Sequence, residues 1–331
     1  MIDVGIIGFG KMGRIRADEV ETSGRGRVTR VYELDSEARF DHPRAGSPED
    51  VIDDPSVEAV FVCTPNHLNR PLTIAALQAG KHVFCEKPPA FTSSEVQEIR
   101  QAEEASGCKL MYGFNHRHHE SIKSMKSLID SGEFGEVLWM RGRYGKSVDK
   151  SFHDHWRANP EISGGGILLD QGIHMVDLFL HLGGTFDQVE AFVSKLYWEM
   201  DIEDNVFAIL RDSGSGRVAS LHSTMTQWRH LFSLEVFLSK GYLVLNGLRT
   251  SSRTYGDEVL SIARNRSAAP AATWEDEERI TYHDDTSWAS EIGHFFDVIE
   301  SDGPVAIGSS ADALELMTLI DTIYERGKRH E

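Results

Sequence analysis

Apolar runs alternate with helix-type patterns along the first third of the chain. Five short runs read as buried strands, at 3–7, 28–32, 59–63, 82–85 and 109–112. A helical stretch at 69–79 ends at Gly80, and another at 92–106 opens with Thr92 and Glu95 as a capping pair. Strands that alternate with helices predict an α/β domain with a parallel sheet and crossover helices.

The pattern changes after about residue 120. A helical run at 119–131 is followed by extended segments, at 137–144, 189–197, 205–210, 218–225, 232–237 and 242–246. Short turns such as 212–216 separate several of them, which predicts a largely antiparallel sheet. We therefore predict two domains, 1–120 and 121–331, with a surface loop at 264–273 in the second.

Length and charge narrow the class of protein. A chain of 331 residues suits two domains with real cores, and no apolar run approaches the roughly 20 residues that span a bilayer. The 34 Lys and Arg against 52 Asp and Glu give a formal charge of −18. This charge disfavours nucleic acid and anionic membranes as partners.

Cysteine usage and the start of the chain bear on the compartment. Cys63, Cys85 and Cys108 lack metal-ligand spacing, and the first two lie in apolar runs. We interpret them as core thiols in a reducing compartment. The first residues enter a strand with no basic segment before it, so we expect a cytoplasmic protein.

A glycine motif follows the first strand and opens the first helix. It reads Gly8-Phe9-Gly10-Lys11-Met12-Gly13. Gly8 permits the tight turn, Gly10 lets the backbone approach a pyrophosphate, and Gly13 lets helix and strand pack closely. The free N–H groups at the helix start complete a site for a dinucleotide.

Glu33 lies 20 residues after Gly13, at the end of the second strand. Its carboxylate can accept hydrogen bonds from the ribose hydroxyls of the adenosine and would repel a 2′-phosphate. We therefore predict NAD rather than NADP. Arg30 and Arg39 are nearby basic residues that would weaken this preference.

Two further segments follow the third and fourth strands, where ligands of open α/β sheets bind. They are Thr64-Pro65-Asn66-His67 and Glu86-Lys87-Pro88-Pro89. Lys87 lies between a buried strand and a proline pair, so its backbone is stiff and its peptide bond to Pro88 is a candidate cis bond. We predict a functional role for this lysine.

An acid and a histidine share one helix face in the second domain. Asp170 and His174 are four residues apart and follow the glycine run 164–166. A histidine beside a carboxylate can transfer protons near neutral pH. The glycines allow another chain or a ligand to approach the helix start closely.

These residues resemble the Gfo/Idh/MocA oxidoreductases, a family that includes inositol dehydrogenases and glucose-fructose oxidoreductase, over essentially the whole chain. The resemblance rests on the glycine motif, Thr64-Pro65-Asn66-His67, 79–83 with Glu86-Lys87-Pro88, Gly113-Phe114-Asn115-His116-Arg117, Trp156-Arg157, and Gly164-Gly165-Gly166 with Asp170 and His174. It departs from the family at Asn69, where a second histidine is common, and at His116, where many members have arginine. We expect both departures to affect substrate choice.

The resemblance implies an N-terminal Rossmann domain with a doubly wound parallel sheet and a C-terminal α+β domain with a large, open, mostly antiparallel sheet. It also implies homodimers or homotetramers built through that sheet. The catalytic set would be Lys87, Asp170 and His174. The cofactor-binding residues would be Gly8, Phe9, Gly10, Lys11, Met12, Gly13, Glu33, Thr64, Pro65, Asn66, His67, Glu86 and Lys87.

We therefore predict an enzyme that transfers a hydride between NAD and a secondary alcohol of a sugar, a cyclitol or a nucleotide sugar. His174 would act as general base, and Lys87 would stabilise the developing alkoxide. Asp170 would orient His174 or hold a substrate hydroxyl. The candidate substrate-binding residues are Lys87, Arg117, Tyr144, His153, His155, Trp156, Arg157, Asp170 and His174.

Alternative functions stay open at this point. A non-catalytic NAD-binding sensor would not need Lys87, Asp170 and His174 together, and a reductase of imines or enones would dispense with the acid-histidine helix. An NAD-dependent glycosidase would form no net NADH. The histidines 116, 118, 119, 153 and 155 invite a metal interpretation, but they lack carboxylate or cysteine partners, so we expect no metal site.

Overall fold

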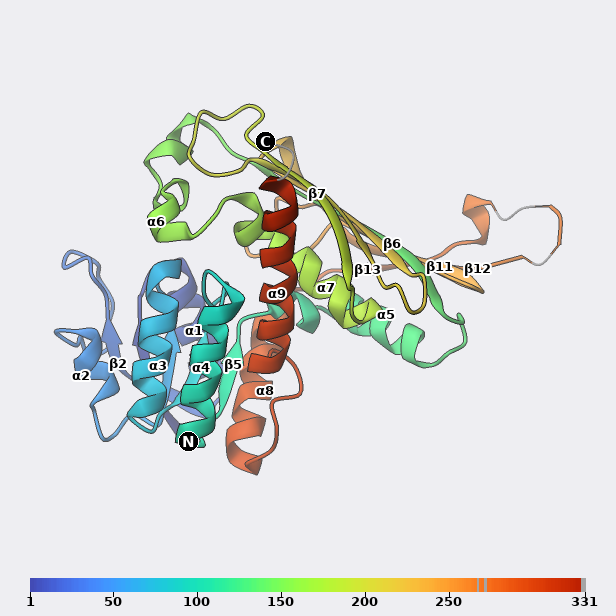
Figure 1. The fold of residues 1–331 in the computed structure, drawn as a ribbon. Coiled ribbons are helices and arrows are strands. Elements are labelled where there is room, and N and C mark those ends of the chain that lie inside the picture. The colour runs from blue at the N-terminus through green and yellow to red at the C-terminus, as the bar shows by residue number, and fades with distance from the viewer. Residues whose placement is uncertain (267, 271–272, 329–331) are drawn as a thin grey trace. The chain divides into compact units, whose positions relative to one another are not determined.

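The structure is a computed structural model that describes residues 1–266, 268–270 and 273–328. The chain divides into two compact units. Unit 1 comprises Met1–Asn115 and Ser287–Thr318, and unit 2 comprises His116–Thr286 and the chain from Leu319 onward. Figure 1 shows the course of the chain through both units.

Unit 1 contains a five-stranded sheet in which every neighbouring pair is parallel. The strands are β1 (Ile2–Ile7), β2 (Gly26–Tyr32), β3 (Ala59–Val62), β4 (His82–Cys85) and β5 (Leu110–Tyr112), in the order β2-β1-β3-β4-β5. The predicted parallel α/β domain is confirmed. The chain leaves β1 toward β2 and then returns to the other side of β1, so the topological switch lies between β1 and β3.

Helices connect the strands of unit 1 and cover its sheet. They are α1 (Lys11–Thr22), α2 (Pro48–Ile52), α3 (Asn69–Gln78), α4 (Ser93–Ser106) and α8 (Ser287–Ser301), with the short turn η1 (Asn66–Leu68) and the first part of α9 (Ser310–Gly327). Helix α3 packs against α4, and α1 packs against α8. Figure 1 shows α3 and α4 side by side in front of the strands.

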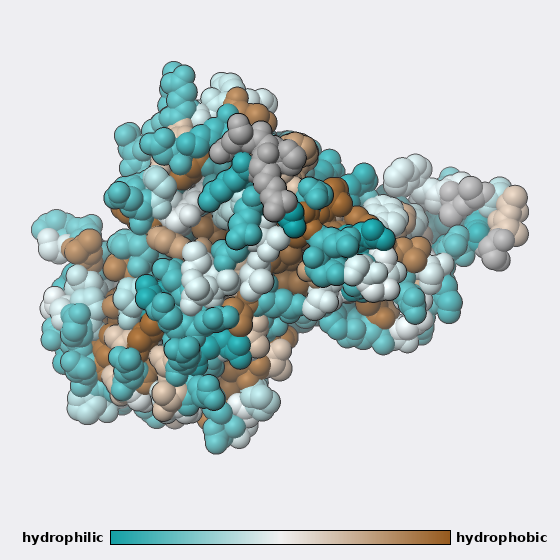
Figure 2. All heavy atoms as spheres, in the orientation of Figure 1, coloured by the Kyte–Doolittle hydropathy of each residue, from teal (hydrophilic) through white to brown (hydrophobic). Residues whose placement is uncertain are grey.

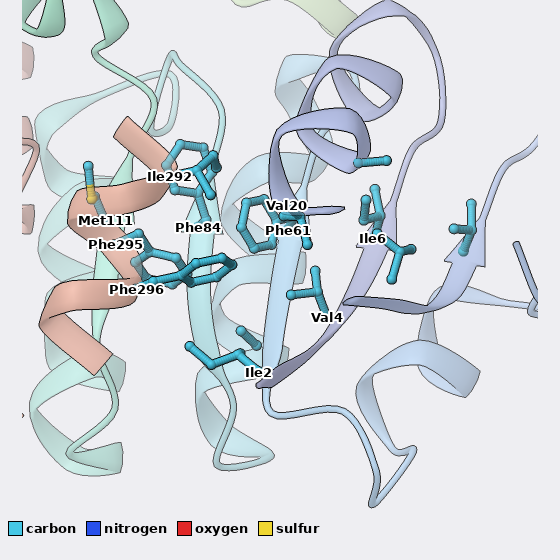
Figure 3. Close-up of a cluster of buried hydrophobic side chains, with 14 of the residues drawn as sticks. Ile2, Val4, Ile6, Val20, Phe61, Phe84, Met111, Ile292, Phe295 and Phe296 are labelled. Carbon is cyan, nitrogen blue, oxygen red and sulfur yellow. The ribbon is translucent and has the colours of Figure 1, made fainter. Parts of the chain in front are cut away.

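A cluster of aromatic and aliphatic side chains fills the interior of unit 1, and Figure 3 shows its members. Phe61 and Phe84 stack at 5.0 Å between ring centroids, and Phe295 of α8 meets them edge-on at 5.7 and 5.6 Å. Phe296 and Ile292 from the same helix face are also buried in this cluster. The apolar face of α8 therefore completes the core of the parallel sheet.

The division into units differs from the predicted domains 1–120 and 121–331. The boundary lies at Asn115, and residues 287–318 return to unit 1. The cause is the amphipathic helix α8, whose phenylalanines pack on strands more than 200 residues earlier in the chain. Periodicity shows that such a helix has an apolar face but does not show which sheet that face will cover.

Unit 2 contains an eight-stranded sheet that is antiparallel at every pair except β6 with β9. Its strands are β6 (Val137–Ser147), β7 (Gln188–Ser194), β8 (Asn205–Arg211), β9 (Val218–Thr224), β10 (Thr226–Leu238), β11 (Gly241–Asn246), β12 (Glu258–Arg264) and β13 (Glu278–Tyr282), in the order β13-β12-β11-β10-β6-β9-β8-β7. The predicted mostly antiparallel sheet is confirmed. Strands β12 and β13, at one edge, were not predicted.

Helices pack on one face of this sheet, with α7 (Ile173–Gly183) on β6 and β9 and α5 (Glu120–Asp130) on β12. The remaining elements are η2 (Asn115–His118), η3 (Lys150–Asp154), η4 (Trp156–Ala158), α6 (Pro160–Ser163), η5 (Leu168–Gly172) and η6 (Trp274–Asp276). The predicted loop at 264–273 lies partly outside the described residues, at 267, 271 and 272. Among the described helices, none has the length and apolar character to cross a membrane.

Truncation of Phe295 to Ala tests the role of α8 in unit 1. We expect Phe295→Ala to lower the free energy of unfolding by about 3–4 kcal/mol, because the cavity lies among packed rings. Urea denaturation measures this difference. Leu34→Ala, at a side chain that is 83% exposed, is the control and should change the free energy by less than about 0.5 kcal/mol. A similar small change for Phe295→Ala would contradict the role of α8.

Candidate active site

The glycine motif forms a tight turn from β1 into α1. Gly8 has a φ of +90°, and a Cβ there would lie 2.5 Å from the carbonyl oxygen of Cys63. A Cβ on Gly13 would lie 2.1 Å from the carbonyl oxygen of Gly8, whereas a Cβ on Gly10 would meet no atom within 4 Å. Gly8 and Gly13 are therefore required by packing, and the space above Gly10 is open, as a pyrophosphate site needs.

The start of α1 is suited to an anion. Gly10 is the N-cap and makes no side-chain cap bond to the first turn. The N–H groups of this turn and the positive end of the helix dipole therefore face the open side of the glycine turn. Lys11 is exposed and Met12 half-buried at this end, while the ring of Phe9 packs 4.8 Å from Phe40 inside the unit.

Glu33 is fixed beside this turn. One carboxylate oxygen accepts a hydrogen bond from the backbone N–H of Phe9 at 2.5 Å, and the other accepts from the N–H of Asp35 at 3.1 Å. Arg30, a possible phosphate ligand from the sequence, instead binds Asp54 at 2.8 Å. The glycine turn, the helix start and the half-buried carboxylate together fit the pyrophosphate and ribose of a dinucleotide.

Lys87 lies on a turn after β4 that is held from both sides. The amide of Asn69 donates hydrogen bonds to the carbonyl oxygens of Glu86 at 3.2 Å and of Pro88 at 2.8 Å. The bond between Lys87 and Pro88 is cis, as predicted. Asn69 is completely buried, so this departure from the family pattern fixes the backbone around Lys87.

Glu86 is buried against Arg16, although we predicted it as a cofactor ligand. Arg16 of α1 donates from Nε to the carboxylate of Glu86 at 2.8 Å and pairs through Nη1 with Glu291 of α8 at 2.6 Å. Burial opposes the charge on Arg16, but Glu291 and Glu86 together raise the pKa of its guanidinium. The ion pair with Arg16 therefore anchors Glu86, and with it the backbone just before Lys87.

The segment after β3 lies next to the same turn. The Thr64 hydroxyl donates to the amide oxygen of Asn69 at 3.1 Å, which orients that amide toward the Lys87 turn. Pro65 precedes η1, in which Asn66 is half-buried and His67 exposed. The structure thus places this segment at the carboxyl end of β3, beside the topological switch.

In unit 2 a buried carboxylate holds the start of the acid-histidine helix. Glu203 accepts hydrogen bonds from the N–H groups of Gly166 at 2.8 Å and Leu168 at 3.0 Å, and from the Tyr324 hydroxyl at 2.8 Å. A Cβ on Gly166 would lie 2.1 Å from the backbone oxygen of Glu203. The segments that approach the glycine run closely belong to the chain itself, whereas we expected another chain or a ligand there.

Asp170 lies in a π-helical turn, η5, and is held by two cations. Lys146 Nζ binds one carboxylate oxygen at 2.5 Å and Arg157 Nε binds the other at 3.3 Å. Two cations stabilise the ionised carboxylate, so Asp170 acts as a fixed anion with oriented donors around it. Lys146 was not predicted, because a lysine near the end of a strand usually lies in solvent.

His174 begins α7 and stacks on His116. The two imidazole rings are nearly parallel, at 16°, and their centroids are 3.8 Å apart. His116 is hydrogen-bonded through Nε2 to the Tyr144 hydroxyl at 3.0 Å, and Tyr144 is in contact with Tyr255 at 5.3 Å between centroids. Burial raises the pKa of Tyr144, so its hydroxyl stays protonated and holds the ring of His116 in place.

Arg117, predicted as a substrate ligand, is buried in a bidentate ion pair with Asp177. Its Nε lies 2.9 Å and its Nη2 lies 2.6 Å from the carboxylate oxygens. Both residues are almost fully buried, so we correct the assignment of Arg117 to a structural one. The sequence does not show this pairing, because the partners are 60 residues apart.

The other predicted substrate residues form a surface beside Asp170. Arg157 covers the ring of Trp156 at 4.2 Å, His155 lies 5.6 Å from Trp156, and His153 and His155 are exposed. His119 does not belong to this surface. Its Nδ1 lies 3.1 Å from the carboxylate of the buried Glu258. Within the described part of the chain, no group of three His, Cys, Asp or Glu side chains is placed to hold a metal ion.

Comparison with known proteins agrees with this arrangement. Residues 2–114 match the family described as "Oxidoreductase family, NAD-binding Rossmann fold", and residues 122–244 match the "GFO/IDH/MocA C-terminal domain". A 1,5-anhydro-D-fructose reductase of Ensifer adhaerens is 31% identical over 68% of this chain and 67% of its own length. A levoglucosan dehydrogenase of Pseudarthrobacter phenanthrenivorans is 30% identical over 59% of this chain, and the match spans only 57% of that relative.

Solved structures share the fold over nearly the whole chain. Levoglucosan dehydrogenase in complex with NADH and levoglucosan superposes with a TM-score of 0.87 at 24% identity, covering 99% of this chain and 97% of that one. The two family matches, together with the parallel sheet and its glycine turn, identify a dinucleotide-binding oxidoreductase. The chain belongs to the Gfo/Idh/MocA family, and its first unit is the NAD-binding Rossmann domain of that family.

Replacement of Glu33 by glutamine tests the cofactor preference. Glu33→Gln keeps an acceptor for the Phe9 N–H but removes the charge that would repel a 2′-phosphate. We expect the ratio of the NADPH to the NADH dissociation constant to fall about tenfold or more, measured by nicotinamide fluorescence, because one charge repulsion of about 1.4 kcal/mol is lost. Asp35→Asn, at the next acid along the chain, is the control. An unchanged ratio in Glu33→Gln would refute the role of this carboxylate.

Proposed function

We propose that this protein is an NAD-dependent dehydrogenase that oxidises a secondary alcohol of a sugar, a cyclitol or a nucleotide sugar. This proposal rests mainly on one observation. In a chain of an oxidoreductase family, Asp170 and His174 follow a glycine run on one helical segment, and Lys146 and Arg157 bind the carboxylate of Asp170. Relatives named myo-inositol 2-dehydrogenase, from Thermotoga maritima, and levoglucosan dehydrogenase support the substrate class.

His174 is the general base in this proposal. Its ring is fixed by the parallel contact with His116, and imidazole has a reference pKa near 6.5 that suits proton transfer from a hydroxyl at neutral pH. His116 therefore positions the base.

Lys87 and Asp170 stabilise and orient the alcohol. The positive charge of Lys87 lowers the free energy of the alkoxide that develops as the proton leaves. Asp170 is held ionised by Lys146 and Arg157, so we favour its role as an acceptor for a neighbouring substrate hydroxyl over direct proton transfer. Bound NAD supplies the hydride acceptor, and the glycine turn, Glu33 and the start of α1 hold it.

Single substitutions test these roles. We expect Lys87→Ala and His174→Ala to lower turnover about a hundredfold or more, because each removes a group that acts in the transition state. NADH formation with inositols, aldoses, uronates and nucleotide sugars measures turnover, and NADH fluorescence checks that cofactor binding is retained. Lys240→Ala and His283→Ala are matched controls on exposed side chains of unit 2.

The same assay separates the alternatives. Unchanged turnover in both variants would refute the assigned roles. A glycoside that is cleaved without net NADH would identify an NAD-dependent glycosidase. A wild-type protein that binds NADH but turns over no compound of the panel with either cofactor would instead support a sensor.

We propose that copies of the chain associate through the uncovered face of the unit 2 sheet. Aromatic side chains lie on it in two groups, in which Phe207 stacks on His222 at 3.9 Å and Trp139 on Phe237 at 4.1 Å. Phe192 pairs with Phe207 on the neighbouring strand, and both are about half exposed. Figure 2 shows hydrophobic side chains exposed over the strands of this sheet. Such a face is typical of a subunit interface.

Light scattering after size-exclusion chromatography tests the assembly. We expect a dimer or tetramer for the wild-type protein and a smaller species for the double variant Phe192→Asp and Phe207→Asp, because buried carboxylates would face each other across the interface. Trp274→Asp, at an exposed ring in η6, is the control. A monomeric wild-type protein would contradict this interface.

The three cysteines support cytoplasmic residence as part of this proposal. All are free thiols, and burial raises the pKa of Cys63 and raises that of Cys85 to about 12. Both thiols are therefore packed as unreactive core groups. This usage is typical of a reducing compartment.

A further inference from the structure

Three aromatic side chains are gathered on the surface of unit 2. Tyr197 and Trp198 follow β7, and Trp228 lies in β10. The ring of Tyr197 lies 5.0 Å from Trp198 and 5.0 Å from Trp228, and the two tryptophans are 6.3 Å apart. Tyr197 is 61% and Trp228 63% exposed. We call these three residues the aromatic platform.

The backbone that carries Tyr197 and Trp198 is held by one buried carboxylate. Asp204 is fully buried and accepts hydrogen bonds from the N–H groups of Leu196 at 2.9 Å and of Tyr197 and Trp198 at 2.8 Å each. The indole N–H of Trp198 also donates to the carbonyl oxygen of Met225 at 3.2 Å. The exposed rings are therefore presented on a fixed loop, which lowers the entropy cost of binding to them.

Trp228 is presented by a bulge in β10. Thr226 pairs with Ser147 of β6, and the next pair is Leu231 with Gly145. The bulge residues 227–230 therefore lie opposite the single residue Lys146. A bulge of this kind redirects side chains and is common beside binding sites.

The platform is continuous with the surface around Asp170. The ring of His153 lies 6.0 Å from Trp198, edge to face. The neighbouring residue, Phe152, lies 5.0 Å from Lys146 Nζ, and Lys146 binds Asp170 at 2.5 Å. The bulge with Trp228 faces the same lysine, so two independent segments lead from Asp170 to the platform.

We propose that the aromatic platform is a subsite for the second ring of a glycoside or disaccharide whose first ring is oxidised beside Asp170. This inference rests on the proposed function and names its substrate class more closely. Aromatic rings pack against the C–H faces of sugar rings. The Tyr197 hydroxyl and the His153 ring nitrogens can form hydrogen bonds with the sugar hydroxyls. The chain therefore prefers a two-ring substrate to the free monosaccharide.

A second copy of the chain is the competing occupant, but the structure favours a sugar. The aromatic side chains on the sheet face already offer a surface for a copy, whereas the platform connects through His153 and Phe152 to the ion pair of Lys146 and Asp170. Aromatic side chains combined with a few placed polar groups are typical of small-molecule sites.

Kinetics with paired substrates test the subsite. Probes are glucose with maltose and cellobiose, and methyl glucoside as a glycoside that lacks a second ring. We expect Trp228→Ala and Tyr197→Ala to lower kcat/KM about tenfold for the disaccharides and less than twofold for glucose and methyl glucoside. Trp274→Ala, at a ring that is 79% exposed, is the control.

A binding measurement separates this proposal from the proposed function. Isothermal titration of the wild-type protein with maltose and cellobiose, in the presence of NADH, should show binding that Trp228→Ala weakens about tenfold, even if no sugar is oxidised. Absence of binding, an equal loss of kcat/KM for all four sugars, or a change of oligomeric state in Trp228→Ala would each overturn the subsite.

Discussion

One buried cation organises the nucleotide-binding unit. Arg16 is fully enclosed, and its guanidinium joins the carboxylates of Glu86 and Glu291 over the ring of Phe84 at 4.4 Å. A charge removed from water is stable only when its partners stay in place, and loss of one partner typically costs about 3–5 kcal/mol. The network therefore ties α1, α8 and the turn that carries Lys87 to one point. The glycine turn at the carboxyl end of β1 depends on the same packing of α1.

In unit 2, buried carboxylates rather than a buried cation hold the surrounding backbone in place. Glu203 is buried among donors from the glycine run and Tyr324, and Asp204, the next residue, holds the loop of the aromatic platform. Adjacent carboxylates at the start of β8 thus position both Asp170 with its helix and the exposed rings. Neither carboxylate is exposed to a ligand. Each acts by fixing the backbone that carries the proposed reactive or binding side chains.

The motifs of the site could be read from the sequence because their tasks are local. A glycine that needs a positive φ, as Gly8 does, or a helix start without a side-chain cap is set by a few neighbouring residues. Partners far apart in the chain could not be read in this way. The sequence suggested Arg117 as a substrate ligand, but in the folded chain it pairs with Asp177. The sequence did not indicate a role for Lys146, which binds Asp170 in the folded chain. Whether a charged side chain faces solvent or a distant partner depends on the packed chain.

The sequence by itself determined the parallel sheet, the mostly antiparallel sheet, the glycine turn and the acid beside it, since each follows from local pattern and spacing. Only the tertiary structure decided that residues 287–318 return to the first unit and that Asn69 and Glu86 hold the Lys87 turn. It also decided that His116 stacks on His174. The physical reason is that burial and pairing are properties of the folded chain. Hydrophobic faces and charges find partners by shape and distance, and a sequence pattern specifies the face but not its partner.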